Sequence, residues 1–208
     1  MSRSERDSRL IEVMAVVLLA LSTVASAWCA YQSTRWNGEE ATLARESTDD
    51  RVEATRLFSF GTQTVAYDSS IASAYAEAYV NGDVDLQNFY RNVLARPEFV
   101  PVLDEWASTA EAGDSRLGSL LTDEDYLAGQ LAGYEEAMAA SDAAANEAGD
   151  AGQVADRYIV LTLVLAGALF FAGVTSSFRS RAVQLALLTM AGVLVAFTVG
   201  QLVDLPVV

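Results

Sequence analysis

The chain has 208 residues, and 52% of them are hydrophobic, yet its 28 acidic side chains outnumber its 13 basic ones and give a net charge of -15. This combination indicates that apolar and acidic residues occupy separate segments. Histidine is absent and Cys29 is the single cysteine. These two facts exclude histidine acid–base chemistry, zinc sites built from histidine and cysteine, and a disulfide within the chain.

All 13 basic residues are arginines. The absence of lysine excludes a P-loop lysine, a Schiff-base lysine and a lysine general base. The arginines form no cluster of the kind that binds phosphate backbones, so the composition argues against a nucleic-acid partner. We also expect no cofactor.

Three long apolar segments predict three transmembrane helices, at residues 10–31, 158–178 and 182–203. Each has the length of about 20 residues that a helix needs to cross a bilayer. Residues 159–178 and 182–203 contain no charged side chain, and only the short sequence Arg179–Arg181 separates them. Two uncharged runs of this length with so short a connection are typical of a helical hairpin in lipid. The predicted fold class is therefore an all-α membrane protein.

The first apolar segment also resembles a secretory signal peptide. Three arginines precede it, Val13–Leu21 resembles a hydrophobic core region, and Ala25–Ala27 fits an A-x-A cleavage site. Cleavage after Ala27 would leave Trp28 as the new N-terminus. We favour a retained anchor because the apolar run is long and the helical pattern continues to Trp36 without a turn signal.

Arginine placement predicts the orientation of the chain. The first nine residues contain three arginines and the hairpin turn contains two, so both are predicted to be cytoplasmic. Residues 32–157 carry 24 acids and 8 arginines, a net charge of -16. The predicted topology, in chain order, is a cytoplasmic N-terminus (1–9), a span (10–31), an acidic extracytoplasmic helical domain (32–157), a span (158–178), a cytoplasmic turn (179–181), a span (182–203) and an extracytoplasmic C-terminus (204–208).

Aromatic residues flank the outer ends of the first two predicted spans. They are Trp28, Tyr31, Trp36 and Tyr158. Amphipathic rings at these positions are typical of a membrane-interface belt.

The extracytoplasmic segment has the pattern of four amphipathic helices, and no alternating run of β-branched residues indicates a sheet. In the first helix, steps of four and three place these residues on one face: Ala54, Phe58, Gly61, Val65, Asp68, Ala72, Tyr75 and Tyr79. The first helix is expected to stop at Asn81–Asp83, and the second is expected to end near Arg96–Pro97. A third helix is expected to begin at Phe99. A fourth is expected to open with a Thr122–Asp125 capping box and to end at Gly149–Gly152. We expect these helices to form a bundle.

Asp68 has two interpretations. It lies on the apolar face, so it is a candidate buried carboxylate that would need a partner. Alternatively, the helix breaks there and Asp68, helped by Ser69 and Ser70, caps the helix that follows. The sequence favours the cap.

Small residues recur at four-residue intervals in two spans. They are Ser22, Ser26 and Ala30 in the first span, and Gly192, Ala196 and Gly200 in the third. Such faces let helix backbones approach closely. The pattern leaves open whether they join the spans of one chain or join two copies.

Several acidic clusters raise the question of a metal site. The Asp83–Asp85 pair lacks the glycine and the terminal glutamate of a calcium loop, and acids at 123–125 suit the start of a helix. We therefore interpret the clusters as solvated charge or helix caps and expect no metal site.

A motif after the first span carries a resemblance. It reads Trp28-x-x-Tyr31-Gln32-x-x-Arg35-Trp36-x-Gly38-Glu39, followed by Arg51, Glu53 and Ala54. It resembles the corresponding segment of a group of uncharacterised bacterial three-span membrane proteins, which share one N-terminal span, a helical middle and a C-terminal hairpin of spans. The resemblance implies this architecture and a bacterial plasma membrane, and it implies no activity.

The sequence favours a membrane-anchored interaction or scaffold protein, with the lipid bilayer and either a protein partner or another copy as its contacts. The first alternative is an accessory subunit of a transporter or channel, which is disfavoured because no ionisable residue lies deep in a predicted span. The second alternative is an external hydrolase with paired carboxylates, for which no motif is present. We expect the protein not to be an enzyme.

Overall fold

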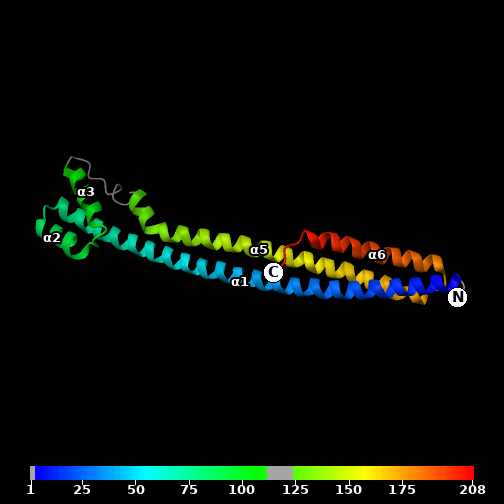
Figure 1. Ribbon diagram of the computed structural model, residues 1–208. Helices are drawn as coiled ribbons and strands as arrows, with labels where there is room; N and C mark the ends of the chain where they lie inside the picture. The colour runs from blue at the N-terminus through cyan, green and yellow to red at the C-terminus, as the bar shows by residue number, and fades with distance from the viewer. Residues whose placement is uncertain (1–2, 112–123) are drawn as a thin grey trace. The chain divides into compact units, whose positions relative to one another are not determined.

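The computed structural model describes residues 3–111 and 124–208, and every regular element in these ranges is helical. The elements are α1 (Arg3–Val80), α2 (Val84–Phe89), the π-helical turn η1 (Tyr90–Leu94), α3 (Val100–Glu111), α5 (Glu124–Val174), the 3-10 turn η2 (Thr175–Ser177) and α6 (Arg181–Val203) (Figure 1). α1, α5 and α6 are each long and apolar enough to cross a membrane. The predicted all-helical class and the three candidate spans are thus confirmed.

The helices group into two compact units. The first unit comprises residues 1–46 and 143–208, and the second comprises residues 47–142. Both α1 and α5 contribute residues to each unit. We describe each unit separately.

The first unit consists of parts of α1 and α5 together with α6. One cluster joins Cys29 of α1 to Tyr158 and Leu165 of α5 and to Leu205, which follows α6. A second cluster joins Ile11 of α1 to Leu188 of α6. The three helices therefore pack on one another through narrow seams, while most of the apolar surface of each faces outward.

The predicted end of a helix at Gly149–Gly152 is wrong, because α5 continues unbroken through these residues. Small residues spaced by three and four are buried along this part of the helix: Ala144, Ala148, Ala151 and Ala155. Gly152 lies against α1, where an added Cβ would come within 3.0 Å of the Glu40 carboxyl carbon. Packing of this small-residue face against α1 outweighs the weak helix propensity of two glycines, which is about 1 kcal/mol each relative to alanine.

The second unit has an aromatic core. Its buried residues are Ile71, Ala72, Tyr75 and Ala76 of α1, Phe99, Leu103 and Trp106 of the α3 region, and Tyr126 of α5. The ring centroid of Trp106 lies 6.1 Å from that of Tyr75 and 5.5 Å from that of Tyr79, in edge-to-face geometry. These contacts show that the predicted face of α1 packs against α3.

The α1 face predicted from Ala54 to Tyr79 is buried or half-buried at seven of its eight positions, the exception being Phe58, which is 46% exposed. Even this ring has a neighbour, since its centroid lies 5.3 Å from that of Tyr134. Gly61 is needed for the close approach of α1 to α5, because a Cβ there would lie 2.7 Å from the carbonyl oxygen of Gln130.

The stop predicted at Asn81–Asp83 is confirmed. Gly82 adopts a φ of 70°, a backbone conformation that glycine reaches without strain. Asp83 then caps α2, because its side chain accepts a 3.0 Å hydrogen bond from the backbone N–H of Leu86. The second helix ends at Ala95, which is extended, as predicted from Arg96–Pro97. Thr122 of the predicted capping box lies outside the described residues.

Candidate functional site

Asp68 is a buried carboxylate and not a helix cap, so the favoured interpretation of this residue is wrong. α1 continues through it, and its side chain is 0% exposed. The hydroxyls of Ser69 and Ser70 donate to carbonyl oxygens of their own helix, at Val65 and Tyr67, and thus cap nothing.

The Asp68 carboxylate accepts three hydrogen bonds from two side chains. Arg96 donates from Nη2 to Oδ2 at 2.6 Å and from Nε to Oδ1 at 3.2 Å. Tyr126 donates its hydroxyl to Oδ2 at 2.5 Å. A guanidinium that binds both oxygens of a carboxylate is among the strongest ion-pair geometries. The network therefore fastens α1 to α5 and to the segment between η1 and α3.

The electrostatics of this network oppose acid–base chemistry near neutral pH. The hydrogen bond to Asp68 raises the pKa of Arg96. Burial, together with the Asp68 carboxylate, raises the pKa of the Tyr126 hydroxyl well above its usual value near 10. Both partners thus stay protonated as donors, and both oxygens of the acceptor are occupied. The arrangement suits a structural fastening better than a catalytic centre.

α2 and η1 present an exposed apolar face. Neither element contains a buried residue. Leu86, Phe89 and Val93 recur at steps of three and four, and they are 38%, 46% and 64% exposed. We call these three residues the α2 face. Their helix is held in place by Arg91, which makes two hydrogen bonds to the Asp104 carboxylate of α3, at 2.6 and 2.7 Å.

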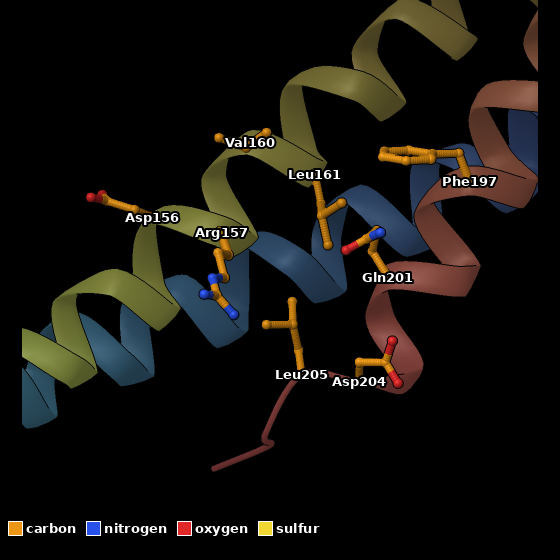
Figure 2. Close-up of a pocket in the computed structure, with 8 residues that line it drawn as sticks. All are labelled: Asp156, Arg157, Val160, Leu161, Phe197, Gln201, Asp204 and Leu205. Carbon is orange, nitrogen blue, oxygen red and sulfur yellow. The ribbon is translucent and has the colours of Figure 1, made fainter.

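In the first unit, a pocket of about 380 Å³ lies between α5 and α6 (Figure 2). Its apolar lining is Val160, Leu161, Phe197 and Leu205, and its polar lining is Asp156, Arg157, Gln201 and Asp204. Figure 2 shows Leu161 and Leu205 pointing toward one another, with the Phe197 ring facing the same space and the Arg157 side chain extending beside Leu205.

The segment after α6 is held against the other two helices by hydrogen bonds. The carbonyl oxygen of Pro206 accepts from Trp36 Nε1 at 3.2 Å and from the Tyr158 hydroxyl at 3.0 Å. The backbone N–H of Val208 donates to Gln32 Oε1 at 3.2 Å. These contacts place Leu205, which is only 9% exposed, at the pocket.

The aromatic residues predicted for a membrane interface differ in exposure. Trp28 and Tyr31 are 46% and 53% exposed, and their ring centroids lie 6.0 Å apart. Trp36 is half-buried. Tyr158 is 1% exposed and packs within the cluster around Cys29, so its ring faces the protein.

The two faces of small residues also differ. Ser22 is buried, and the hydroxyls of Ser22 and Ser26 are enclosed without a hydrogen-bond partner among the described residues, whereas Ala30 is exposed. On α6, an added Cβ at Gly192 or Gly200 would meet nothing within 4 Å, and Ala196 is exposed. The α6 face is therefore not in tight contact with the rest of this chain, although Gly192 and Ala196 line a groove that Val17 of α1 also lines.

Within residues 9–111 and 125–208, whose side chains the structure describes, no group of three or more acidic or cysteine side chains is arranged to hold a metal ion. The acids at 123 and 124 of one predicted cluster lie outside the residues whose side chains are described.

No protein-family model matches the chain, and neither the curated proteins nor the solved structures contain a match to it.

Sequence reasoning did not find Arg96 or Tyr126 as the partners of Asp68. A buried carboxylate needs a cationic partner, but the predicted domain contains eight arginines. No sequence pattern identifies Arg96 among them as that partner. The α2 face was predicted only as part of an amphipathic helix, with no indication that these side chains stay exposed.

Proposed function

We propose that this protein is a membrane-anchored interaction or scaffold protein whose acidic helical segment, residues 32–157, docks a protein partner or another copy of itself outside the cytoplasm. The carrying observation is the α2 face: three apolar residues at helical spacing that stay exposed on a unit that also has a buried aromatic core. The lack of an acid–base centre at Asp68 supports a binding role over a catalytic one.

The membrane anchor is supported by the surface of the first unit. Only 17%, 28% and 22% of the residues in the most apolar stretches of α1, α5 and α6 are buried. Large apolar side chains such as Val24, Leu163 and Phe170 are more than 60% exposed. An apolar surface of this extent is unfavourable in water and favourable in hydrocarbon. The distribution of arginines supports a cytoplasmic N-terminus, and the motif after the first span supports a bacterial plasma membrane.

The α2 face has the properties of a docking surface. Burying an apolar side chain of this size contributes roughly 1.5–3 kcal/mol, so three such residues can supply useful affinity. Asp83 and Asp85 lie at the N-terminal end of the face, which gives a polar edge beside an apolar centre. The fastening of η1 to α3 through Arg91 and Asp104 holds the face in one conformation, which lowers the entropic cost of binding.

The test is capture of partners by the full chain in mild detergent. The double variant Phe89→Ser with Val93→Ser should lose at least about tenfold in partner affinity or in self-association, because serine removes the apolar area. Val52→Ser is the matched control, since Val52 is equally exposed in the same unit but lies outside the α2 face. Unchanged capture by the double variant would overturn the docking proposal.

Self-association through the membrane helices is a separate route to a homo-oligomer. Gly192→Cys on the open face of α6 would crosslink two copies if that face joins them. A crosslink that survives the Phe89→Ser with Val93→Ser variant would assign the dimer contact to α6, whereas loss of the crosslink in that variant would assign self-docking to the α2 face.

A role as an accessory subunit of a transporter or channel is the second candidate. It is favoured by the enclosed hydroxyls of Ser22 and Ser26 within the first predicted span and by the enclosed amide nitrogen Nε2 of Gln32 directly after it, none of which has a hydrogen-bond partner in the described part of the chain. Enclosed polar groups in a span are unfavourable unless they contact water, an ion or another subunit. Ion flux through liposomes that contain the purified chain would support this candidate over a scaffold.

A further inference from the structure

The pocket between α5 and α6 divides into a charged end and an apolar end. Arg157 directly precedes the second predicted span, and Asp204 directly follows the third. Val160 and Phe197 lie farther inside these spans and are 56% and 53% exposed. In the proposed membrane anchor, the charged end lies at the headgroup level and the apolar end faces the acyl chains.

The charges at the pocket select a type of ligand. No ion pair or hydrogen bond joins the Arg157 guanidinium to another side chain in the described ranges. A guanidinium of this kind binds a phosphate diester well. Asp204 lies on the other side of Leu205 from Arg157 in Figure 2, and a carboxylate there pairs with a primary ammonium group.

The balance of charges disfavours an anionic ligand. Arg157 is the single cation of the lining, whereas Asp156 and Asp204 are both anions. A phospholipid without an amine would leave a carboxylate facing its phosphate, which is repulsive. A choline headgroup carries no N–H donor for that carboxylate. A headgroup with both a phosphate and a primary amine satisfies both Arg157 and Asp204 at the charged end of the pocket.

The pocket is also preformed. Hydrogen bonds from Trp36 and Tyr158 to the Pro206 carbonyl fix the position of Leu205, which forms part of its floor. Its volume of about 380 Å³ lies in the range of pockets that hold small ligands. This space accommodates a headgroup and its glycerol region, while the acyl chains would lie along the exposed apolar surface of α5 and α6.

We infer that this pocket binds an ethanolamine phospholipid, with the phosphate on Arg157, the ammonium group on Asp204 and the start of the acyl chains against Val160 and Phe197. The inference rests on the membrane part of the proposed function and does not depend on the α2 face. It assigns to the first unit a lipid-binding site at the outer end of the helices.

The experiment compares lipids that remain bound to the purified full chain, measured by native mass spectrometry in detergent. Phosphatidylethanolamine should be retained at least about tenfold better than phosphatidylglycerol. Arg157→Gln should lower phosphatidylethanolamine retention by about tenfold, because it removes a charge-assisted contact. Arg35→Gln is the matched control, since Arg35 is exposed, belongs to the same unit and lies outside the pocket.

Two further variants separate loss of a ligand contact from damage to the protein. Asp204→Asn should shift the preference toward phosphatidylglycerol, because it removes the repulsive carboxylate. Val160→Trp should displace the lipid by filling the apolar end without a change of charge. Equal retention of the two lipids, or equal effects of Arg157→Gln and Arg35→Gln, would overturn the inference.

A soluble headgroup analogue tests whether the bound ligand is a lipid or a free small molecule. Phosphoethanolamine at millimolar concentration should not displace the lipid, because it lacks the acyl chains that contact Val160 and Phe197. Full displacement by phosphoethanolamine would overturn the lipid assignment in favour of a soluble ligand.

Extraction of membranes with alkaline carbonate, on the same variants, distinguishes failure of the membrane anchor from failure of the lipid pocket. Released protein contradicts the membrane anchor, whereas retained protein without a lipid preference contradicts the pocket alone.

Discussion

The two units of the molecule place their apolar residues in opposite ways. In the second unit the large aromatic residues Phe99, Trp106 and Tyr75 are buried together, and the enclosed carboxylate of Asp68 has three hydrogen bonds. In the first unit many large apolar residues lie on the outside, and small or polar ones such as Ser22 and Thr198 are buried as well as Leu165.

This difference supports the proposal that the first unit lies in lipid and the second in water. A water-exposed unit gains stability by burying apolar area, and its interior tolerates a charge only when that charge is paired. A lipid-exposed unit gains nothing from hiding apolar area, so its seams use small residues and close packing instead. Substitutions of the same kind should therefore have opposite consequences in the two units.

The largest effect is expected from truncating the aromatic core of the second unit. Phe99→Ala should lower the free energy of unfolding by about 4 kcal/mol, because it leaves a cavity among fully buried neighbours. The measurement is hydrogen exchange of residues 47–142 in the full chain. Phe60→Ala, at a side chain that is 67% exposed, is the control and should change little. Similar effects of the two variants would show that the core is not packed as described.

A charge on the outer surface of the first unit should be nearly as damaging. Leu163→Asp should disfavour membrane insertion by about 3 kcal/mol, because the exposed Leu163 lies within the second predicted span. Val52→Asp, at a similarly exposed position of the second unit, should have almost no effect. Insertion is measured by resistance to carbonate extraction. Equal tolerance of both variants would contradict the assignment of different solvents to the two units.

Removing the charge of Asp68 should have a moderate effect. Asp68→Asn keeps the shape but loses the short ion pair, which leaves Arg96 with the longer 3.7 Å contact to Glu98, so we expect a loss of about 2 kcal/mol in the stability of the second unit. Chemical unfolding of the full chain, followed by hydrogen exchange at Tyr126, is the measurement. Asp142→Asn, at an exposed ion pair with Arg51, is the control. Equal stability of both variants would refute a fastening role for Asp68.

The smallest effect concerns the pH dependence of the second unit. The Arg91 guanidinium, chiefly through its hydrogen bonds, lowers the pKa of Asp104. Because the unfolded state then binds the proton more readily, this pair stabilises the fold above the unfolded pKa near 3.9, and the contribution is lost as the pH falls through the folded pKa. The pair is partly exposed, so solvent screening limits its contribution to about 0.5 kcal/mol.

A comparison of unfolding between pH 5 and pH 2 tests this contribution. Asp104→Asn should remove the corresponding part of the acid sensitivity. An unchanged pH profile in that variant would contradict a stabilising Arg91–Asp104 pair.

Much of the helical architecture was predictable from local patterns. The spacing from Ala54 to Tyr79 identified the packed face of α1, and Asn81–Asp83 identified its end. These features depend on neighbours in the sequence: the 3.6-residue period, and the turn conformation that Gly82 adopts. The lengths of the apolar runs identified the candidate spans in the same way.

Two predictions were wrong for a common reason. The glycines at 149 and 152 suggested the end of a helix, and Asp68 with two serines suggested a helix cap. Glycines often end helices, and aspartate and serine often cap them. The helix continues at Gly152 because α1 packs against it, and it continues at Asp68 because Arg96 and Tyr126 satisfy the carboxylate. In each case a distant contact outweighed a local preference.

The net charge, the missing residue types, the helical periods and the apolar run lengths follow from the order of residues alone, since each depends on composition or on near neighbours. The partners of Asp68, which lie 28 and 58 positions away, were decided by the packing of helices in three dimensions. So were the exposure of the α2 face and the pocket beside Leu205. Local sequence specifies which face of a helix is apolar, but only tertiary contacts decide which of those faces are covered.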